Sequence, residues 1–168
     1  NEYDGCFEGC ESLSSINIPT SVSNIGDYCF LRCETLSTIS IPTSVSVIGE
    51  WSFCLCSSLT SISIPSSVIV IGEGCFLWCS SLNKLIIDEG NEYFKLEDGM
   101  IMNKEKSIAV DYIGSNRATT YTIPTSVSYI GNECFSYCSS MTSISIPTSV
   151  SEIGDGCFRW CRSLTSIS

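Results

Sequence analysis

Apolar residues recur along the chain with a fixed period of 23 residues. The segment Leu59–Cys79 reads LTSISIPSSVIVIGEGCFLWC, and it matches LSTISIPTSVSVIGEWSFCLC at Leu36–Cys56 and LSSINIPTSVSNIGDYCFLRC at Leu13–Cys33. The pattern returns as MTSISIPTSVSEIGDGCFRWC at Met141–Cys161. A period of this length is typical of stacked supersecondary units, each of which buries its apolar face against its neighbours. The sequence therefore predicts a repeat solenoid.

The first half of each repeat is predicted to form two short strands. In the repeat that begins at Leu59, Ile62 and Ile64 alternate with serines, which is the period of two expected of a strand with one buried face. Pro65 ends that strand because proline has no N–H to donate to a sheet. We interpret Val68–Ile71 as a second short strand beyond a polar corner.

The second half of each repeat is predicted to be a short helical turn. Gly72 ends the second strand, and Phe76 and Cys79, three residues apart, would share one face of the turn. The residue after the glycine has a side-chain oxygen that suits a helix N-cap. In successive repeats it is Asp27, Glu50, Glu73, Asn132 and Asp155. One repeat is thus a coil of strand, corner, strand and helical turn.

The period extends over the whole chain and predicts about seven coils. We interpret residues 1–168 as a single solenoid, because the repeat runs through them with one irregularity. Solenoids need polar terminal caps, and neither end carries one. The chain is therefore expected to be a fragment of a longer array.

One repeat is longer than the others. The Ile-Pro pair that ends at Pro124 follows the pair that ends at Pro65 by 59 residues, where two periods would give 46. This irregular repeat, residues 83–122, contains two apolar runs, Met100–Met102 and Ile108–Ile113, around a polar turn. Such a pattern predicts a hairpin insertion. Insertions of this kind lie on one face of a solenoid, often the binding face.

Charge and composition exclude several classes of function. The net charge is −10, and the chain has eight Lys and Arg, five of them within residues 83–117, so no basic stripe is available for nucleic acid. No apolar run approaches the roughly 20 residues of a membrane helix, so no membrane insertion is expected. There is no histidine, which excludes Ser-His and Cys-His nucleophiles and histidine-containing zinc sites. We therefore expect no enzyme, no catalytic residue, no cofactor and no metal site.

Twelve cysteines recur with the repeat and leave three interpretations open. The first is a buried column of reduced thiols, because free cysteine is among the most buried residue types. The second is a set of disulfides between neighbouring coils or within a turn, and the third is metal binding. Ser52 stands in the column that is otherwise cysteine and favours the first interpretation, because serine fills a small site but cannot form a bridge.

The repeated motif carries a family resemblance. The pattern F-x-x-C-x-x-L-x-x-I-x-I-P-x-x-V-x-x-I-G, present as FLRCETLSTISIPTSVSVIG and FSYCSSMTSISIPTSVSEIG, resembles the 23-residue leucine-rich repeat of BspA-like surface proteins. The resemblance covers essentially the whole chain. It implies a leucine-rich-repeat-type stack on a cell-surface or secreted protein that acts in adhesion, with a host or matrix protein or another solenoid as its partner. It implies no catalytic residues.

The chain departs from the family pattern at the position before the conserved cysteine, where the family often has glycine. Bulky side chains occupy that position in five coils. Aromatic residues in a row there are either covered, here by the hairpin of residues 100–113 across Trp78 and Tyr137, or they form a contact surface. Two lysines of the hairpin turn join this set. The predicted partner-binding residues are Arg32, Leu55, Trp78, Tyr137, Trp160, Lys104 and Lys106.

Two other functions remain open at this point. One is an intracellular or periplasmic scaffold, and in the cytoplasm the twelve thiols would stay reduced. The other is a flat hydroxyl ladder that organises water or glycan on the strands. Its columns would be Thr38, Ser61, Thr120 and Ser143 beside Ser40, Ser63, Thr122 and Ser145.

Overall fold

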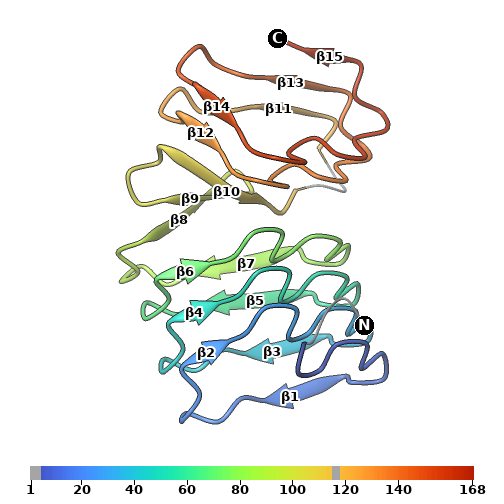
Figure 1. Ribbon diagram of the computed structural model, residues 1–168, viewed down its shortest axis with the longest axis vertical. Coiled ribbons are helices and arrows are strands. Elements are labelled where there is room, and N and C mark those ends of the chain that lie inside the picture. The colour runs from blue at the N-terminus through green and yellow to red at the C-terminus, as the bar shows by residue number, and fades with distance from the viewer. Residues whose placement is uncertain (1–4, 115–117) are drawn as a thin grey trace. The chain divides into compact units, whose positions relative to one another are not determined.

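The computed structural model describes residues 5–114 and 118–168. The chain divides into two compact units, one that ends at Leu96 and one that begins at Glu97, which we call unit 1 and unit 2. Each unit is a stack of coils whose short strands pair in parallel with their equivalents in the neighbouring coils (Figure 1). The predicted fold class, a leucine-rich-repeat-type solenoid, is confirmed.

Unit 1 contains two parallel sheets, each made of one strand per coil. The larger sheet has the order β1-β3-β5-β7 and the smaller one β2-β4-β6. Their bounds are Ser15–Asn17 for β1, Asn24–Ile25 for β2, Thr38–Ser40 for β3, Val47–Ile48 for β4, Ser61–Ile64 for β5, Val70–Ile71 for β6 and Lys84–Ile87 for β7. The second strand of each coil is shorter than expected, because Val68 N–H donates to Pro65 O at 3.2 Å and so belongs to the corner.

Unit 2 also contains two sheets. One has the order β11-β13-β15, and the other includes β9, β10, β12 and β14 as successive neighbours. The bounds are Met100–Asn103 for β9, Ile108–Tyr112 for β10, Thr120–Thr122 for β11, Tyr129–Ile130 for β12, Ser143–Ser145 for β13, Glu152–Ile153 for β14 and Ser166–Ile167 for β15. Strand β8 (Phe94–Glu97) crosses the division between the units.

The register of the sheets follows the sequence period. Ile16 pairs with Ile39, and Ile48 pairs with Ile71, each pair 23 residues apart. Equivalent side chains therefore stack in columns through the coils. The phenylalanines form one such column in unit 1, where the ring centroids of Phe30 and Phe53 are 5.3 Å apart and those of Phe53 and Phe76 are 5.8 Å apart.

The predicted helical turn is wrong, because the described residues form no helix. After the conserved glycine the backbone N–H groups alternate between two kinds of partner. Cys33 N–H donates to Phe30 O in its own coil at 3.1 Å, whereas Arg32 N–H donates to Cys54 O of the next coil at 2.9 Å. A helix would direct every N–H to its own segment, four residues back. Here the neighbouring coil takes every second one, and the segment becomes consecutive tight turns.

Hydroxyl side chains attach each coil to the one before it. Thr60 Oγ1 donates to Ser37 O at 3.3 Å, Ser67 Oγ donates to Val45 O at 2.6 Å, and Thr142 Oγ1 donates to Thr119 O at 2.9 Å. The same contact recurs one coil further on at many positions, so much of the serine and threonine content of the chain has a structural role.

The longer coil contains the predicted hairpin. Strands β9 and β10 are antiparallel, with Met102 opposite Ala109 and Met100 opposite Tyr112. Met100 and Met102 are fully buried in the core of unit 2. The bounds of the irregular repeat at 83–122 and the interpretation of residues 1–168 as one solenoid fragment stay predictions.

Candidate functional site

The position before the conserved cysteine lies in the left-handed region of backbone conformation. The φ angles are +63° at Arg32, Leu55 and Trp78, +59° at Tyr137 and +60° at Trp160. This conformation costs an L-amino acid roughly 1–2 kcal/mol, and glycine adopts it freely. Gly9, the equivalent residue in the first described coil, has a φ of +68°. The backbone therefore favours glycine here, and five coils nevertheless carry large side chains.

In unit 2 the predicted residues of this column form a cluster. The rings of Tyr137 and Trp160 are stacked, with centroids 6.1 Å apart and an angle of 19° between their planes. The guanidinium carbon of Arg162 lies 5.3 Å from the centroid of the Trp160 ring. We call Tyr137, Trp160 and Arg162 the aromatic cluster. Sequence reasoning missed Arg162, although its place two residues after an exposed tryptophan was a signal that could have found it.

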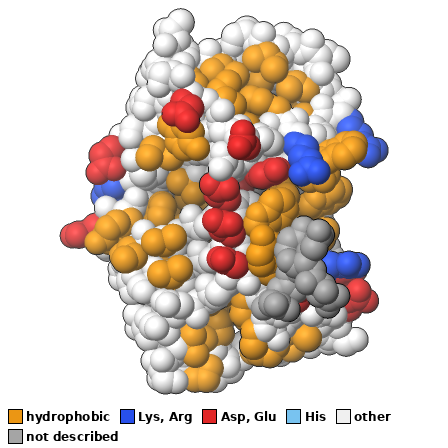
Figure 2. Space-filling model, in the orientation of Figure 1, with side chains coloured by type: hydrophobic (Ala, Val, Ile, Leu, Met, Phe, Trp, Pro, Cys, Tyr) orange, Lys and Arg blue, Asp and Glu red, His pale blue; other side chains and the backbone are white. Residues whose placement is uncertain are grey.

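The aromatic cluster is open to solvent. Trp160 keeps 47% of its surface exposed, Arg162 is exposed and Tyr137 is half-buried. Hydrophobic side chains reach the surface in separate patches on the face seen in Figure 2. Next to the cluster in sequence, Arg159 makes an ion pair with Glu133 at 3.7 Å. Arg162 is thus the cationic group that lies on the tryptophan.

The predicted residues of unit 1 lie in the equivalent column of that unit. Arg32 is exposed and forms an ion pair with Glu11 at 3.9 Å. Leu55 is half-buried, and Trp78 keeps 43% of its surface exposed. The unit 1 column therefore offers one exposed aromatic ring, and the aromatic cluster of unit 2 offers two stacked rings and a guanidinium.

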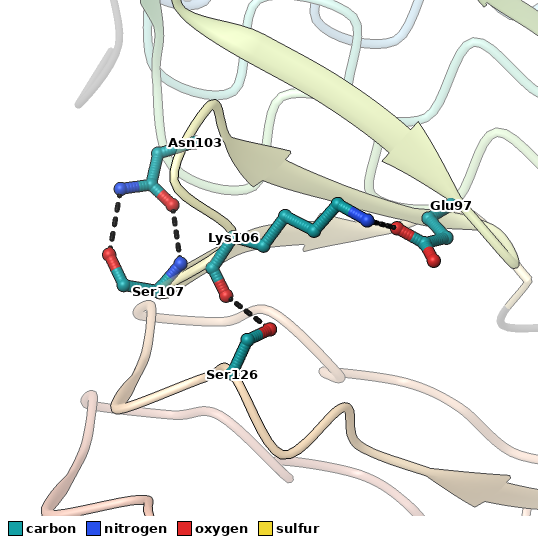
Figure 3. A network of polar contacts seen from close by, with 5 residues as sticks. All are labelled: Glu97, Asn103, Lys106, Ser107 and Ser126. Atoms are coloured by element: carbon teal, nitrogen blue, oxygen red, sulfur yellow. Dashed lines mark hydrogen bonds and ion pairs between the residues drawn. The ribbon is translucent and has the colours of Figure 1, made fainter.

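The hairpin turn holds its lysines in a network of polar contacts (Figure 3). The side-chain oxygen of Asn103 accepts from Ser107 N–H at 2.8 Å and closes the turn. Lys106 Nζ makes an ion pair with Glu97 at 2.5 Å, and Ser126 Oγ donates to Lys106 O at 2.8 Å. Lys106 therefore has a structural role in the turn. The neighbouring Lys104 is half-buried.

None of the cysteines in the described part of the chain is in a disulfide. Most of the cysteines form two columns, one just before the phenylalanine of a coil and one three residues after it. In the second column the thiol donates to the backbone carbonyl of the preceding coil's phenylalanine, as Cys56 does to Phe30 O at 3.2 Å and Cys79 to Phe53 O at 3.1 Å. Ser52 in the other column lies 3.3 Å from Cys75 Sγ. Burial raises the pKa of the Cys29 and Cys33 thiols to about 11, and an adjacent cysteine adds to the shift in each case. These environments favour the protonated, unreactive thiol.

Within residues 5–114 and 118–168, no group of histidine, cysteine or acidic side chains is arranged to hold a metal ion. The same part of the chain contains no helix that could cross a membrane. The hydroxyls predicted to form a flat ladder are exposed or half-buried. They lie in register between coils, since Thr38 pairs with Ser61 and Thr120 pairs with Ser143.

Comparison with known proteins identifies the repeat. The family described as BspA type leucine-rich repeat region matches residues 3–103 and 106–168, in six copies. No curated protein sequence matches the chain.

Solved structures give the same result. A leucine-rich cell surface protein from Faecalibacterium prausnitzii is 31% identical, with a TM-score of 0.84 over 97% of this chain and 43% of its own. The pneumococcal vaccine antigen PcpA is 25% identical, with a TM-score of 0.83 over 92% of this chain and 39% of its own. A leucine-rich repeat protein from Eubacterium ventriosum, 22% identical with a TM-score of 0.67 over 96% of this chain and 55% of its own, shares the fold. The chain spans about two fifths of the length of the first two proteins.

Proposed function

Because the chain belongs to the BspA-type leucine-rich repeat family, we propose that it is a non-enzymatic protein-binding module of a cell-surface or secreted protein. In this proposal the aromatic cluster of unit 2 is the principal contact surface, and the partner is a host or matrix protein. The similar protein from Faecalibacterium prausnitzii is described as a cell surface protein, and PcpA as a vaccine antigen. Both descriptions support an extracellular role.

The observation that carries the proposal is the conflict between backbone and side chain at Trp160. Its φ of +60° favours glycine, and 47% of its surface is exposed, so burial recovers little of the cost of a large residue there. A contact with Tyr137 offsets part of that cost, because stacked aromatic pairs contribute about 0.5–1.5 kcal/mol. A binding partner that covers the ring would account for the remainder.

The chemistry of the cluster fits a protein partner. Tryptophan, tyrosine and arginine are the residue types most enriched among the side chains that dominate binding energy at protein interfaces. Trp160 and Arg162 present an apolar ring and a fixed cation side by side. An acidic or aromatic segment of a partner protein would complement this surface.

A non-enzymatic role agrees with how the potential nucleophiles are used. The chain has no histidine to act as a base. Many of its hydroxyls donate to backbone carbonyls of the preceding coil, and the Cys33 and Cys56 thiols do the same.

The proposal is tested by measuring binding of the purified chain to a panel of purified extracellular-matrix proteins by surface plasmon resonance. For a partner that binds, Trp160→Ala should raise Kd by about 30-fold or more, the effect of losing a dominant interface residue. Trp78→Ala is the matched control, because it removes an exposed tryptophan with the same backbone conformation from unit 1. The assignment of the surface would be contradicted if Trp160→Ala bound with unchanged affinity. It would also be contradicted if the variant lost affinity only because it was unfolded, as judged by circular dichroism.

A further inference from the structure

Cys138 and Cys161 occupy the same position in successive coils of unit 2. The coils are held in register beside them, because Tyr137 N–H donates to Arg159 O at 2.7 Å. Two groups converge on one acceptor: Cys138 N–H donates to Phe135 O at 3.2 Å, and Cys161 Sγ donates to the same oxygen at 3.1 Å. Equivalent residues of hydrogen-bonded neighbouring chains are about 4.8 Å apart, within the 4.4–6.8 Å that a disulfide requires between Cα atoms.

The two thiols differ in their access to solvent. Cys138 is fully buried, whereas Cys161 is half-buried and can be reached from solvent. The pair thus combines one accessible sulfur with one protected sulfur behind it. In the same column of unit 1, Cys33, Cys56 and Cys79 are buried, and Cys10, in the first described coil, is exposed.

We propose that Cys138 and Cys161 form an oxidation site at which a hydroperoxide converts Cys161 to a sulfenic acid and Cys138 then forms a disulfide with it. The bond joins two neighbouring coils. It does not depend on the partner-binding role, because neither thiol belongs to the aromatic cluster.

The steps balance as a two-electron oxidation. The Cys161 thiolate attacks the nearer peroxide oxygen, the O–O bond breaks, and hydroxide leaves and takes up a proton to become water. Cys138 then loses its proton, its sulfur attacks the sulfenic sulfur, and the S–O bond breaks as the second water leaves. Two thiols and one hydrogen peroxide give one disulfide and two waters, so the sulfurs are oxidised and the peroxide is reduced.

The electrostatics of the pair favour this division of roles. Hydrogen bonding between the two side chains lowers the pKa of the Cys161 thiol, and the same interaction together with burial raises the pKa of the Cys138 thiol. The thiolate is the nucleophile in attack on a peroxide. Cys161 is therefore the sulfur that reacts first, and Cys138 stays protonated until the sulfenic acid is formed.

The test treats the native 168-residue chain with hydrogen peroxide, blocks free thiols and digests the protein with trypsin. Cleavage after Arg159 and Arg162 isolates Cys161 in the tripeptide 160–162, so a disulfide appears in mass spectra as that tripeptide joined to peptide 118–159. Fragmentation must place the link at Cys138, because peptide 118–159 also contains Cys134 and Cys157. The linked species should disappear on reduction.

Three variants sharpen the test. Cys161→Ser should abolish the linked peptide, Cys138→Ser should leave a sulfenic acid at Cys161 that dimedone traps, and Cys56→Ser, a buried thiol of the same column in unit 1, should leave the linked peptide unchanged. Twelve free thiols after peroxide treatment of the wild-type chain would overturn the proposal, and so would a link from Cys161 to Cys157. The wild-type measurement decides the question even where a variant fails to fold.

Discussion

The side-chain carboxylate of Asp27 accepts a hydrogen bond from the backbone N–H of Glu50, its equivalent one coil later, at 2.8 Å. The sequence suggested that the acidic residue after the conserved glycine is the N-cap of its own segment, and this prediction is wrong. The residue satisfies a donor of the next coil, and so it connects coils. In unit 2 an amide does the same work, since Asn132 Oδ1 accepts from Asp155 N–H at 2.7 Å.

This contact predicts different effects of two substitutions at Asp27. Asp27→Asn keeps the acceptor and removes one of two adjacent negative charges, so the free energy of unfolding should stay within about 0.5 kcal/mol of wild type. Asp27→Ala leaves the Glu50 N–H without its partner and should cost about 1 kcal/mol. Urea denaturation followed by circular dichroism measures both. Equal stability of the two variants would show that the hydrogen bond has no energetic role.

The repeat itself could be predicted from the sequence, and the conformation of its turns could not. The alternation around Ile62 and the proline at position 65 fix the strand that became β5. The spacing of Phe76 and Cys79 fits one face of a helix and equally fits consecutive tight turns, because both bring residues three apart together. The outcome depends on hydrogen bonds between coils, such as Trp51 N–H to Glu73 O, which no single repeat contains.

The candidate site was predictable in part, for a similar reason. The bulky residues before the conserved cysteine were visible as departures from a repeated pattern, and both tryptophans among them are exposed. Three features depend on the folded backbone and cannot be obtained from the sequence pattern alone: the positive φ of that position, the ion pair of Lys106 and the approach of Arg162 to Trp160.

The phenylalanine column should be the most sensitive part of the unit 1 core. Phe53 is fully buried, and its ring lies between those of Phe30 and Phe76 at centroid distances of 5.3 and 5.8 Å. Phe53→Ala should lower the free energy of unfolding by about 3–5 kcal/mol, because it removes the ring and leaves a cavity. Phe53→Leu refills part of the space and serves as the control, with a smaller loss in the same urea titration. A loss below about 1 kcal/mol for the alanine variant would contradict tight packing of the column.

Asn91 should be important for the stability of the fold at the point where the regular repeat is followed by the longer one. It stands in the column of Val45 and Val68, fully buried, and its Nδ2 donates to Pro65 O at 3.1 Å and to Val68 O at 2.9 Å. Its Oδ1 accepts from two backbone N–H groups, those of Tyr93 and Phe94, each at 2.8 Å.

Replacing Asn91 tests whether hydrogen bonding or packing dominates at this point. Asn91→Val restores the valine of the regular repeat and removes the four hydrogen bonds of the amide, although Pro65 O keeps its bond from Val68 N–H. The substitution should therefore cost about 3 kcal/mol in the free energy of unfolding. Val45→Asn, the reverse exchange in a regular coil, is the control and should also destabilise, because it buries an amide at a valine site. Stabilisation by Asn91→Val, measured by thermal and urea unfolding, would show that packing alone governs the column.

The left-handed backbone at the residue before the conserved cysteine predicts that glycine is tolerated there. Leu55 has a φ of +63° and is half-buried, so Leu55→Gly relieves backbone strain while it loses a modest contact and some unfolded-state restriction. The free energy of unfolding should change by less than about 1 kcal/mol in either direction. Leu55→Ile should instead destabilise by about 1–2 kcal/mol, because a branched Cβ fits this conformation poorly. A glycine variant less stable than the isoleucine variant would contradict this account.

Buried thiols should make the fold sensitive to alkali. Burial raises the pKa of Cys29 and of Cys33 from an ordinary value of 9.0 to about 11. Below pH 9 both thiols are protonated in the folded and unfolded states, and the full stability is present. Between about pH 9 and pH 11 the unfolded chain loses these protons and the folded chain keeps them, so stability falls as pH rises through this window.

Urea midpoints at intervals from pH 8 to pH 11 should show that decline, and it should be shallower in a Cys29→Ser, Cys33→Ser double variant. Serine is a conservative choice, since Ser52 already occupies the column of Cys29 and a hydroxyl at position 33 can still donate to Phe7 O, as the Cys33 thiol does at 3.2 Å. Parallel declines in the variant and the wild type would show that other groups, such as lysines and tyrosines, cause the loss.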